Sequence, residues 1–243
     1  MEIRGKIALV TGSAKRVGKA IALALAQRGA HVVVHYNTSA VQAEEVAAQA
    51  RSLGVEAVGL QADLADPAQV GTLFEAVAEH FGRLDVLVNS ASVYEPTPIE
   101  TLTAEQWDRQ FNTNARGPAL CIRHAVPLMR EHGGAIVNLC DISAGRPYAN
   151  YLAYCASKAA LLAVTAAAAK GLAQYRIRVN SISPGIAMWQ EGVKEAARQA
   201  ILRQIPLGRP GSGEEIAQTA LFLIAHDYIT GEDIRVDGGW FLR

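Results

Sequence analysis

The sequence has no excess charge of either sign, few aromatic residues and only three cysteines. Its 23 basic side chains are matched by 23 acidic ones, so bulk electrostatics favours neither a nucleic acid nor an anionic membrane surface as a partner. Cys121, Cys140 and Cys155 lack the spacing of a disulfide framework, which predicts reduced thiols in a cytoplasmic protein. The histidines show no ligand spacing, so we expect no metal site.

Long apolar runs are also missing. The run that ends before Thr11 is too short for the apolar core of a signal peptide, so we expect no export. The Ala-rich stretch from Ala159 to Ala169 is shorter than the roughly 20 residues that a membrane span needs, and Lys158 and Lys170 flank it. This stretch is therefore expected to be a buried helix, with no membrane as a partner.

Short runs rich in Val, Ile and Leu alternate with longer segments of helical period. This alternation predicts an α/β fold, a single domain over residues 1–243 with a Rossmann-type doubly wound parallel sheet of about seven strands and helices on both faces. We expect strands near 6–11, 31–36, 56–61, 84–89, 134–140, 176–182 and 232–236. Helices are expected near 16–29, 39–53, 67–81, 103–131, 151–174, 191–204 and 213–226. The segment 184–212, rich in Pro and Gly, is expected to form a lid over a site.

The turn after the first expected strand has the features of a phosphate-binding loop. Gly12 and Gly18 would let the backbone approach a pyrophosphate, and the following helix would offer free N–H groups and a partial positive charge. Lys15 and Arg16 add positive charge, and Arg16 stands where the middle glycine of the usual three-glycine turn would be. An ordinary strand-to-helix turn is the alternative interpretation.

No acidic residue follows the second expected strand, which ends His35-Tyr36-Asn37-Thr38-Ser39. A site for NAD would carry Asp or Glu there, on the ribose 2′-hydroxyl. A 2′-phosphate would instead be accepted by Arg16, Ser39, Asn37 and His35, so the sequence favours NADPH/NADP over NADH. Alternatively, His35 and Asn37 only close a turn.

Other residues expected at the cofactor site lie beside the glycine turn or after later strands. Asp63 is expected near the adenine, or else as a helix cap before Pro67. The remaining expected cofactor-binding residues are Val17, Tyr36, Leu64, Asn89, Ser90 and Ala91.

Tyr154 and Lys158 lie four residues apart on one expected helix, so they share a face. A tyrosine with its ordinary pKa of about 10 is a poor acid–base group at neutral pH. The charge of Lys158, together with the oxidised nicotinamide, is expected to lower the pKa of Tyr154. Asp141, at the end of the preceding strand, would complete a proton-transfer site; alternatively it caps a turn beside Ser143.

Together these features resemble the short-chain dehydrogenase/reductase family over essentially the whole chain, from Thr11-Gly12 to Val236-Asp237-Gly238-Gly239. The resemblance implies that Asn114 holds a water near the lysine and that Pro184-Gly185, followed by Ile186, lies under the nicotinamide. It also implies a homotetramer. The family's catalytic serine normally stands where this sequence has Asp141.

Asp141, Arg16 and the segment from His35 to Ser39 are similar to the pteridine reductase branch of that family. By this likeness Ser92 touches the pterin and Tyr94 stacks on it, although the branch usually has Asn at Ser90 and Phe at Tyr94. The implied function is NADPH-dependent reduction of a (dihydro)pterin C=N bond, with Tyr154 and Asp141 as proton donors. Dihydrofolate is a further candidate substrate.

Two other functions remain open. One is a carbonyl reductase of the same fold, acting on a ketone or a 3-oxoacyl group; the other is a non-catalytic NADPH-binding regulator. Trp189 either lines the substrate pocket or packs in the core. The apolar end Trp240-Phe241-Leu242-Arg243 is expected to dock on a neighbouring subunit, where Arg243 would reach the neighbour's site.

Overall fold

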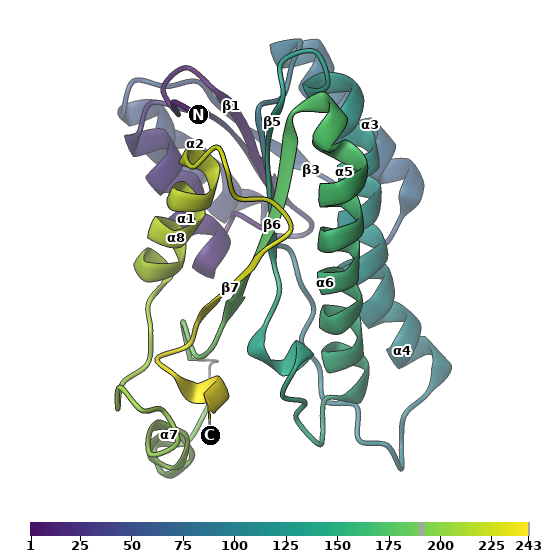
Figure 1. Cartoon of the computed structure of the whole chain (residues 1–243), viewed down its shortest axis with the longest axis vertical. Coiled ribbons are helices and arrows are strands. Elements are labelled where there is room, and N and C mark those ends of the chain that lie inside the picture. Colours follow the sequence, from purple (N-terminus) through teal and green to yellow (C-terminus); the bar gives the residue numbers. More distant parts are fainter. Residues whose placement is uncertain (190–191, 243) are drawn as a thin grey trace.

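The computed structural model describes residues 1–189 and 192–242, and in this part of the chain seven strands form one sheet (Figure 1). The strand order is β3-β2-β1-β4-β5-β6-β7, and every neighbouring pair is parallel. The strands are β1 (Ile7–Val10), β2 (His31–Tyr36), β3 (Ala57–Gln61), β4 (Val86–Asn89), β5 (Gly134–Leu139), β6 (Ile177–Pro184) and β7 (Asp233–Val236). The expected α/β fold is confirmed.

Helices cover both faces of the sheet, as Figure 1 shows. They are α1 (Arg16–Gln27), α2 (Ala40–Ser52), α3 (Pro67–Phe81), α4 (Ala104–Phe111), α5 (Gly117–Met129), α6 (Leu152–Leu172), α7 (Glu195–Leu202) and α8 (Gly213–Ala225). Because side chains alternate along a strand, Val10 and Val32 pack towards α1, α2 and α8, whereas Leu9 and Val33 pack towards α3, α5 and α6. The described residues therefore form one apolar core on each face of the sheet, and a smaller apolar cluster lies around Trp240.

Helix α6 is long and apolar enough to cross a membrane, judged by length and composition alone. In the structure it is a core helix, since it packs along β6 and buries Leu161, Thr165 and Ala169. Its composition is explained by this packing.

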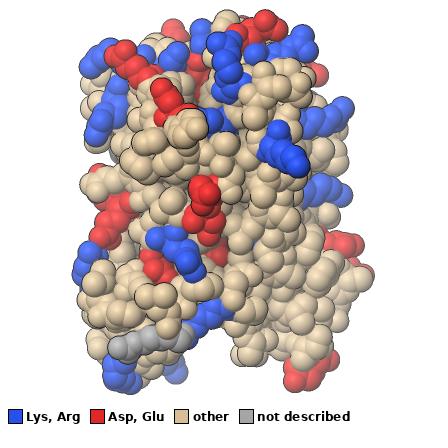
Figure 2. Space-filling model, in the orientation of Figure 1, with Lys and Arg blue, Asp and Glu red and all other residues tan. Residues whose placement is uncertain are grey.

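Charged side chains of both signs are interspersed on the face shown in Figure 2.

The single helix expected over 103–131 is divided in two. A π-helical turn, Asn112–Arg116, separates α4 from α5. The turn buries Asn114, whose amide binds the backbone of Val93 and the hydroxyl of Ser157. A π-helical turn accommodates one extra residue in a helix, which here directs Asn114 inwards.

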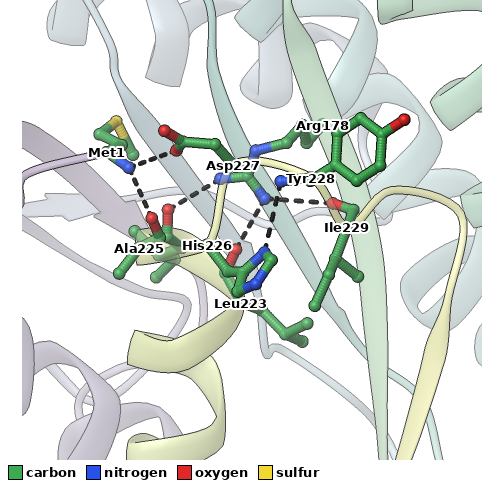
Figure 3. A network of polar contacts seen from close by, with 9 residues as sticks. Met1, Arg178, Leu223, Ala225, His226, Asp227, Tyr228 and Ile229 are labelled. Carbon is green, nitrogen blue, oxygen red and sulfur yellow. Dashed lines mark hydrogen bonds and ion pairs between the residues drawn. The ribbon is translucent and has the colours of Figure 1, made fainter.

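The C-terminal end of α8 is closed by a side chain from another element. Arg178, near the start of β6, donates to the carbonyl oxygens of Leu223 (2.7 Å), Ile224 (2.8 Å) and Ile229 (3.2 Å), and Figure 3 shows this network. Burial lowers the pKa of Arg178. The network lies at the amino-terminal edge of the sheet, opposite the edge where the strands end.

Candidate active site

A cavity of about 1140 Å³ lies at the carboxyl ends of the strands. Ligands of open parallel sheets bind at this edge, because the loops that follow the strands converge there. The walls come from the turn after β1, the ends of β2 to β6 and the segment that follows β6. Helix α7 and the C-terminal residues lie at the same end of the molecule (Figure 1).

Most residues that the sequence predicts for the site line this cavity. Near β1 and β2 they are Gly12, Lys15, Arg16, Val17, Gly18, His35, Tyr36, Asn37 and Ser39. After β3 and β4 they are Asp63, Leu64, Ser90, Ala91, Ser92 and Tyr94. From the later strands they are Asp141, Tyr154, Lys158, Pro184, Gly185, Ile186 and Trp189.

Asn89 and Asn114 are not among the lining residues. Asn89 is buried and donates to the side chain of Asn138 at 2.8 Å, so its side chain supports the sheet instead of contacting a cofactor. Asn114 binds both backbone polar groups of Val93 and accepts from Ser92 at 3.1 Å. It thereby fixes the segment that carries Ser92, and the structure brings its amide to that segment instead of to Lys158.

The glycine turn after β1 is compressed in a way that only glycine allows. Gly12 has φ +63°, and a Cβ there would lie 2.7 Å from the Cα of Ala91. A Cβ on Gly18 would lie 2.4 Å from the carbonyl oxygen of Gly12. The first N–H groups of α1 have no acceptor within the helix, and Lys15 and Arg16 add positive charge. These residues fit the pyrophosphate of a dinucleotide.

The end of β2 forms the part of the cavity wall where the sequence predicts the ribose of the cofactor. Asn37, Thr38 and Ser39 line the cavity, and no carboxylate lies among them. Asp63 lines the cavity and also accepts from the N–H of Ala65 at 2.9 Å, so it is a turn residue as well. The cap of α3 is Asp66, which accepts from Ala68.

The guanidinium of Arg16 binds backbone oxygens, whereas the sequence predicts that it binds a phosphate. Arg16 has a φ of +54°, in the left-handed region, and its guanidinium donates to the carbonyl oxygens of Met188 (3.0 Å) and Trp189 (3.2 Å). Arg198 of α7 lies 5.5 Å from the Trp189 ring centroid. The turn and the segment after β6 are therefore joined across the cavity in this structure.

His35 does not face a ribose phosphate as expected. It is buried, its Nδ1 accepts from the N–H of Gly12, and its Nε2 lies 3.1 Å from the carbonyl oxygen of Ala62. Both ring nitrogens are therefore occupied by the backbone, and the expected contact with a 2′-phosphate is wrong for this arrangement.

The residues that the sequence predicts for proton transfer meet where β5 ends and α6 begins. The Tyr154 hydroxyl donates to Oδ2 of Asp141 at 2.9 Å, and the N–H of Ser143 donates to Oδ1 at 2.7 Å. Asp141 therefore both contacts the tyrosine and caps the turn. Lys158 donates to the carbonyl oxygen of Leu139 at 2.7 Å, with its Nζ 5.7 Å from the Tyr154 ring centroid.

Burial dominates the protonation of this group. It raises the pKa of Tyr154 well above its ordinary value, and the charge of Asp141 raises it further, so without a ligand the expected lowering by Lys158 does not occur. Burial also raises the pKa of Asp141 and lowers the pKa of Lys158. Burial therefore shifts all three groups towards their neutral forms.

An aromatic cluster forms the wall next to Tyr154. Tyr94 stacks on Tyr151 (ring centroids 4.3 Å apart, 18° between planes) and meets Tyr154 edge-on at 4.6 Å. Tyr148 and Trp240 extend this wall. Tyr148 and Tyr151 were not predicted for the site from the sequence, although both stand just before the helix that carries Tyr154.

Trp240 packs within its own chain, which corrects the expected docking of this residue on a neighbour. It is buried beside Ile142 and Ile205, because β7 delivers the C-terminal residues to the carboxyl edge of the sheet. Leu242 is exposed, and the expected role of Arg243 falls outside the described residues.

Comparisons with known proteins agree with this geometry. Residues 12–241 match a family model described as enoyl-(acyl carrier protein) reductase. The chain is 37% identical over 245 residues to a 3-oxoacyl-(acyl-carrier-protein) reductase of Staphylococcus aureus, covering 98% of each chain. It is 33% identical over 257 residues to galactitol 2-dehydrogenase of Agrobacterium fabrum, again covering 98% of each. A solved variant of a Serratia marcescens short-chain dehydrogenase/reductase superposes with a TM-score of 0.94 at 32% identity, covering 99% of this chain and 100% of that one.

Proposed function

Because the chain belongs to the short-chain dehydrogenase/reductase family, we propose that it is an NADPH-dependent reductase of a (dihydro)pterin C=N bond. The observation that carries this proposal is the hydrogen bond of 2.9 Å between the Tyr154 hydroxyl and the Asp141 carboxyl. Burial raises the pKa of this carboxyl and so favours its protonated form, and a protonated carboxyl beside the tyrosine suits a reaction that must protonate a ring nitrogen.

The protein groups have separate tasks in this reaction. A bound nicotinamide cofactor would supply the hydride. Tyr154 gives its hydroxyl proton to the ring nitrogen, and protonated Asp141 replaces that proton across their hydrogen bond. In a 7,8-dihydropterin the hydride enters at C6 and the proton at N5; in a fully oxidised pterin they enter at C7 and N8. Lys158, held by the Leu139 carbonyl, keeps positive charge close to the tyrosine when it is protonated.

The aromatic wall supports a flat substrate. A pterin needs an aromatic surface and hydrogen-bonding groups along its edge. Tyr94 offers a ring that is held in place by Tyr151, and Ser92 and Trp189 also line the cavity. NADPH is preferred over NADH in this proposal, because the end of β2 carries Asn37 and Ser39 without a carboxylate.

The second candidate is a carbonyl reductase acting on a 3-oxoacyl group or a ketone. The relatives favour this candidate over a pterin reductase: one of them is named a 3-oxoacyl reductase, and the matching family is described by an acyl-carrier-protein substrate. We place the pterin first because Asp141, which forms the hydrogen bond with Tyr154, and the stacked ring of Tyr94 are the features that resemble the pteridine reductase branch.

One assay separates the two candidates. NADPH oxidation would be measured with dihydrobiopterin, dihydromonapterin, dihydrofolate, a 3-oxoacyl thioester and a simple ketone. We expect the highest kcat/KM with a dihydropterin. Turnover of the thioester without turnover of any pterin or folate would establish the carbonyl reductase, and binding of NADPH without any turnover would support a regulator.

The assembly and location are also part of the proposal. Cys121, Cys140 and Cys155 are free and buried, which suits the reducing cytoplasm. Exposed Phe222 and Tyr228, near the end of α8, offer apolar surface for self-association into a homotetramer. Light scattering of the purified protein tests this assembly, and a monomer would reject it.

A further inference from the structure

His35 holds two successive N–H groups of the glycine turn. Its ring Nδ1 accepts from Gly12 at 3.0 Å, and its carbonyl oxygen accepts from Ser13 at 3.0 Å. The residue is 2% exposed and lies near the end of β2, beside β1. No other described side chain accepts the Gly12 N–H, so the imidazole is the group that fixes this part of the turn.

The partners of the ring determine which nitrogen carries the proton. The Gly12 N–H is a donor, so Nδ1 must be unprotonated; the Ala62 carbonyl is an acceptor, so Nε2 must carry the proton. The charged group that acts on the ring is Asp63, after β3, whereas Lys15 and Arg16 of the turn line the same cavity. Burial lowers the pKa of His35 to about 4, which keeps the ring neutral at physiological pH.

We propose that His35 is a positioning residue of the dinucleotide site. Its neutral ring holds Gly12 in the left-handed conformation against Ala91, so that the N–H groups that begin α1 open into the cavity. The same ring binds Ala62, next to Asp63, and so sets the distance between the turn and the edge of β3. This inference rests on the binding of NAD(P)H by the family site.

Two substitutions of His35 each remove one of the two hydrogen bonds that its ring makes. His35→Asn places an amide oxygen near the position of Nδ1, so it can accept from Gly12 but loses Ala62. His35→Gln places an amide nitrogen near the position of Nε2, so it can donate to Ala62 but leaves Gly12 without an acceptor. Each variant loses one hydrogen bond, and we expect similar decreases in Tm for both.

NADP⁺ affinity is then measured by calorimetry, with no substrate present. We expect His35→Asn to bind within about threefold of wild type and His35→Gln to bind about five- to tenfold more weakly, since an unpaired buried N–H disturbs the turn. A merely structural role would weaken binding equally in both variants. Equal affinities in the two variants would overturn the inference, whether or not they differ from wild type.

Two further results keep the test decisive. If neither variant folds, the ¹⁵N chemical shifts of the wild-type imidazole are measured instead of the affinities of the variants. An unprotonated Nδ1 whose chemical shift changes on addition of NADP⁺ supports the role, and a protonated Nδ1 overturns it. If wild type itself binds neither NADP⁺ nor NAD⁺, the cofactor assignment fails and this inference fails with it. If the wild type binds NADP⁺ but the two variants bind it with equal affinity, the inference about His35 fails and the cofactor assignment stands.

Discussion

Replacing Asp141 with Asn tests the proton-transfer pair most directly. The carboxyl lies 2.9 Å from the Tyr154 hydroxyl and 2.7 Å from the N–H of Ser143. Asparagine has nearly the same shape and can keep the contact with Ser143 through its amide oxygen. It cannot supply an acidic proton, so the substitution removes the proposed proton donation and preserves the packing around residue 141.

The size of the effect follows from the role of a second acid. General acid catalysis contributes about 10²- to 10⁴-fold, and Tyr154 remains in the variant, so we expect kcat for a dihydropterin to fall about 10²-fold. Removal of the carboxylate also removes a charge that raises the pKa of Tyr154, so that pKa falls in the variant.

The pH dependence gives the sharper measurement. Burial raises the pKa of Asp141, and the reaction needs its protonated form, so wild-type kcat/KM should fall as the pH rises through this pKa. In Asp141→Asn this decrease should be absent, which leaves a lower and flat profile. Asp141→Ser serves as the matched control, because its hydroxyl can bind Tyr154 but does not titrate in this range.

Thermal unfolding supplies an independent check with a defined sign. A carboxyl with a raised pKa makes the folded state bind more protons than the unfolded state, so the free energy of unfolding falls as the pH rises between the two pKa values. Asp141→Asn should therefore have a higher Tm than wild type above that range, with the difference shrinking at low pH. Unchanged pterin turnover and an unchanged pH profile in the variant would refute the proton-donor role.

Three further predictions concern the cofactor and substrate ends. Asn37→Asp puts a carboxylate where a 2′-phosphate is expected, so the ratio of kcat/KM for NADPH to that for NADH should fall at least about tenfold; an unchanged ratio would count against the NADPH assignment. Tyr94→Leu should raise KM for a pterin while Tyr94→Phe keeps it, because the stacked ring matters more than the hydroxyl; equal KM values would contradict stacking. Gly18→Ala should abolish NADP⁺ binding and lower Tm, because its Cβ would lie 2.4 Å from the Gly12 oxygen. Gly171→Ala is the control, since a Cβ there faces open space. Tight NADP⁺ binding by Gly18→Ala would contradict the close packing of the turn.

The sheet could be predicted from the sequence because strands buried on both faces have an almost continuous apolar sequence. The run expected over 31–36 is strand β2 itself, and the helix expected over 67–81 is α3. The division of the helix expected over 103–131 was not predicted. Gly117-Pro118 indicates an interruption, because Pro118 has no N–H to donate within the helix, but the π-helical form of Asn112–Arg116 also depends on the burial of Asn114.

The residues of the proton-transfer pair could be predicted, but their protonation could not. Tyr154 and Lys158 share a helix face, and Asp141 ends the strand before them, so their proximity follows from secondary structure. The pKa of Tyr154 instead depends on burial by segments distant in the sequence, and Lys158 is engaged by a backbone carbonyl of β5. His35 was misassigned for the same reason, since its residue type suits a phosphate but its neighbours in space are backbone groups.

The network around Arg178 and the residues of the candidate active site lie at opposite edges of the sheet. It ties α8 to β6 at the amino-terminal edge of the sheet, whereas Tyr154 and the glycine turn work at the carboxyl edge. We therefore expect substitutions around Arg178 to change the thermal stability of the protein more than its binding of a cofactor.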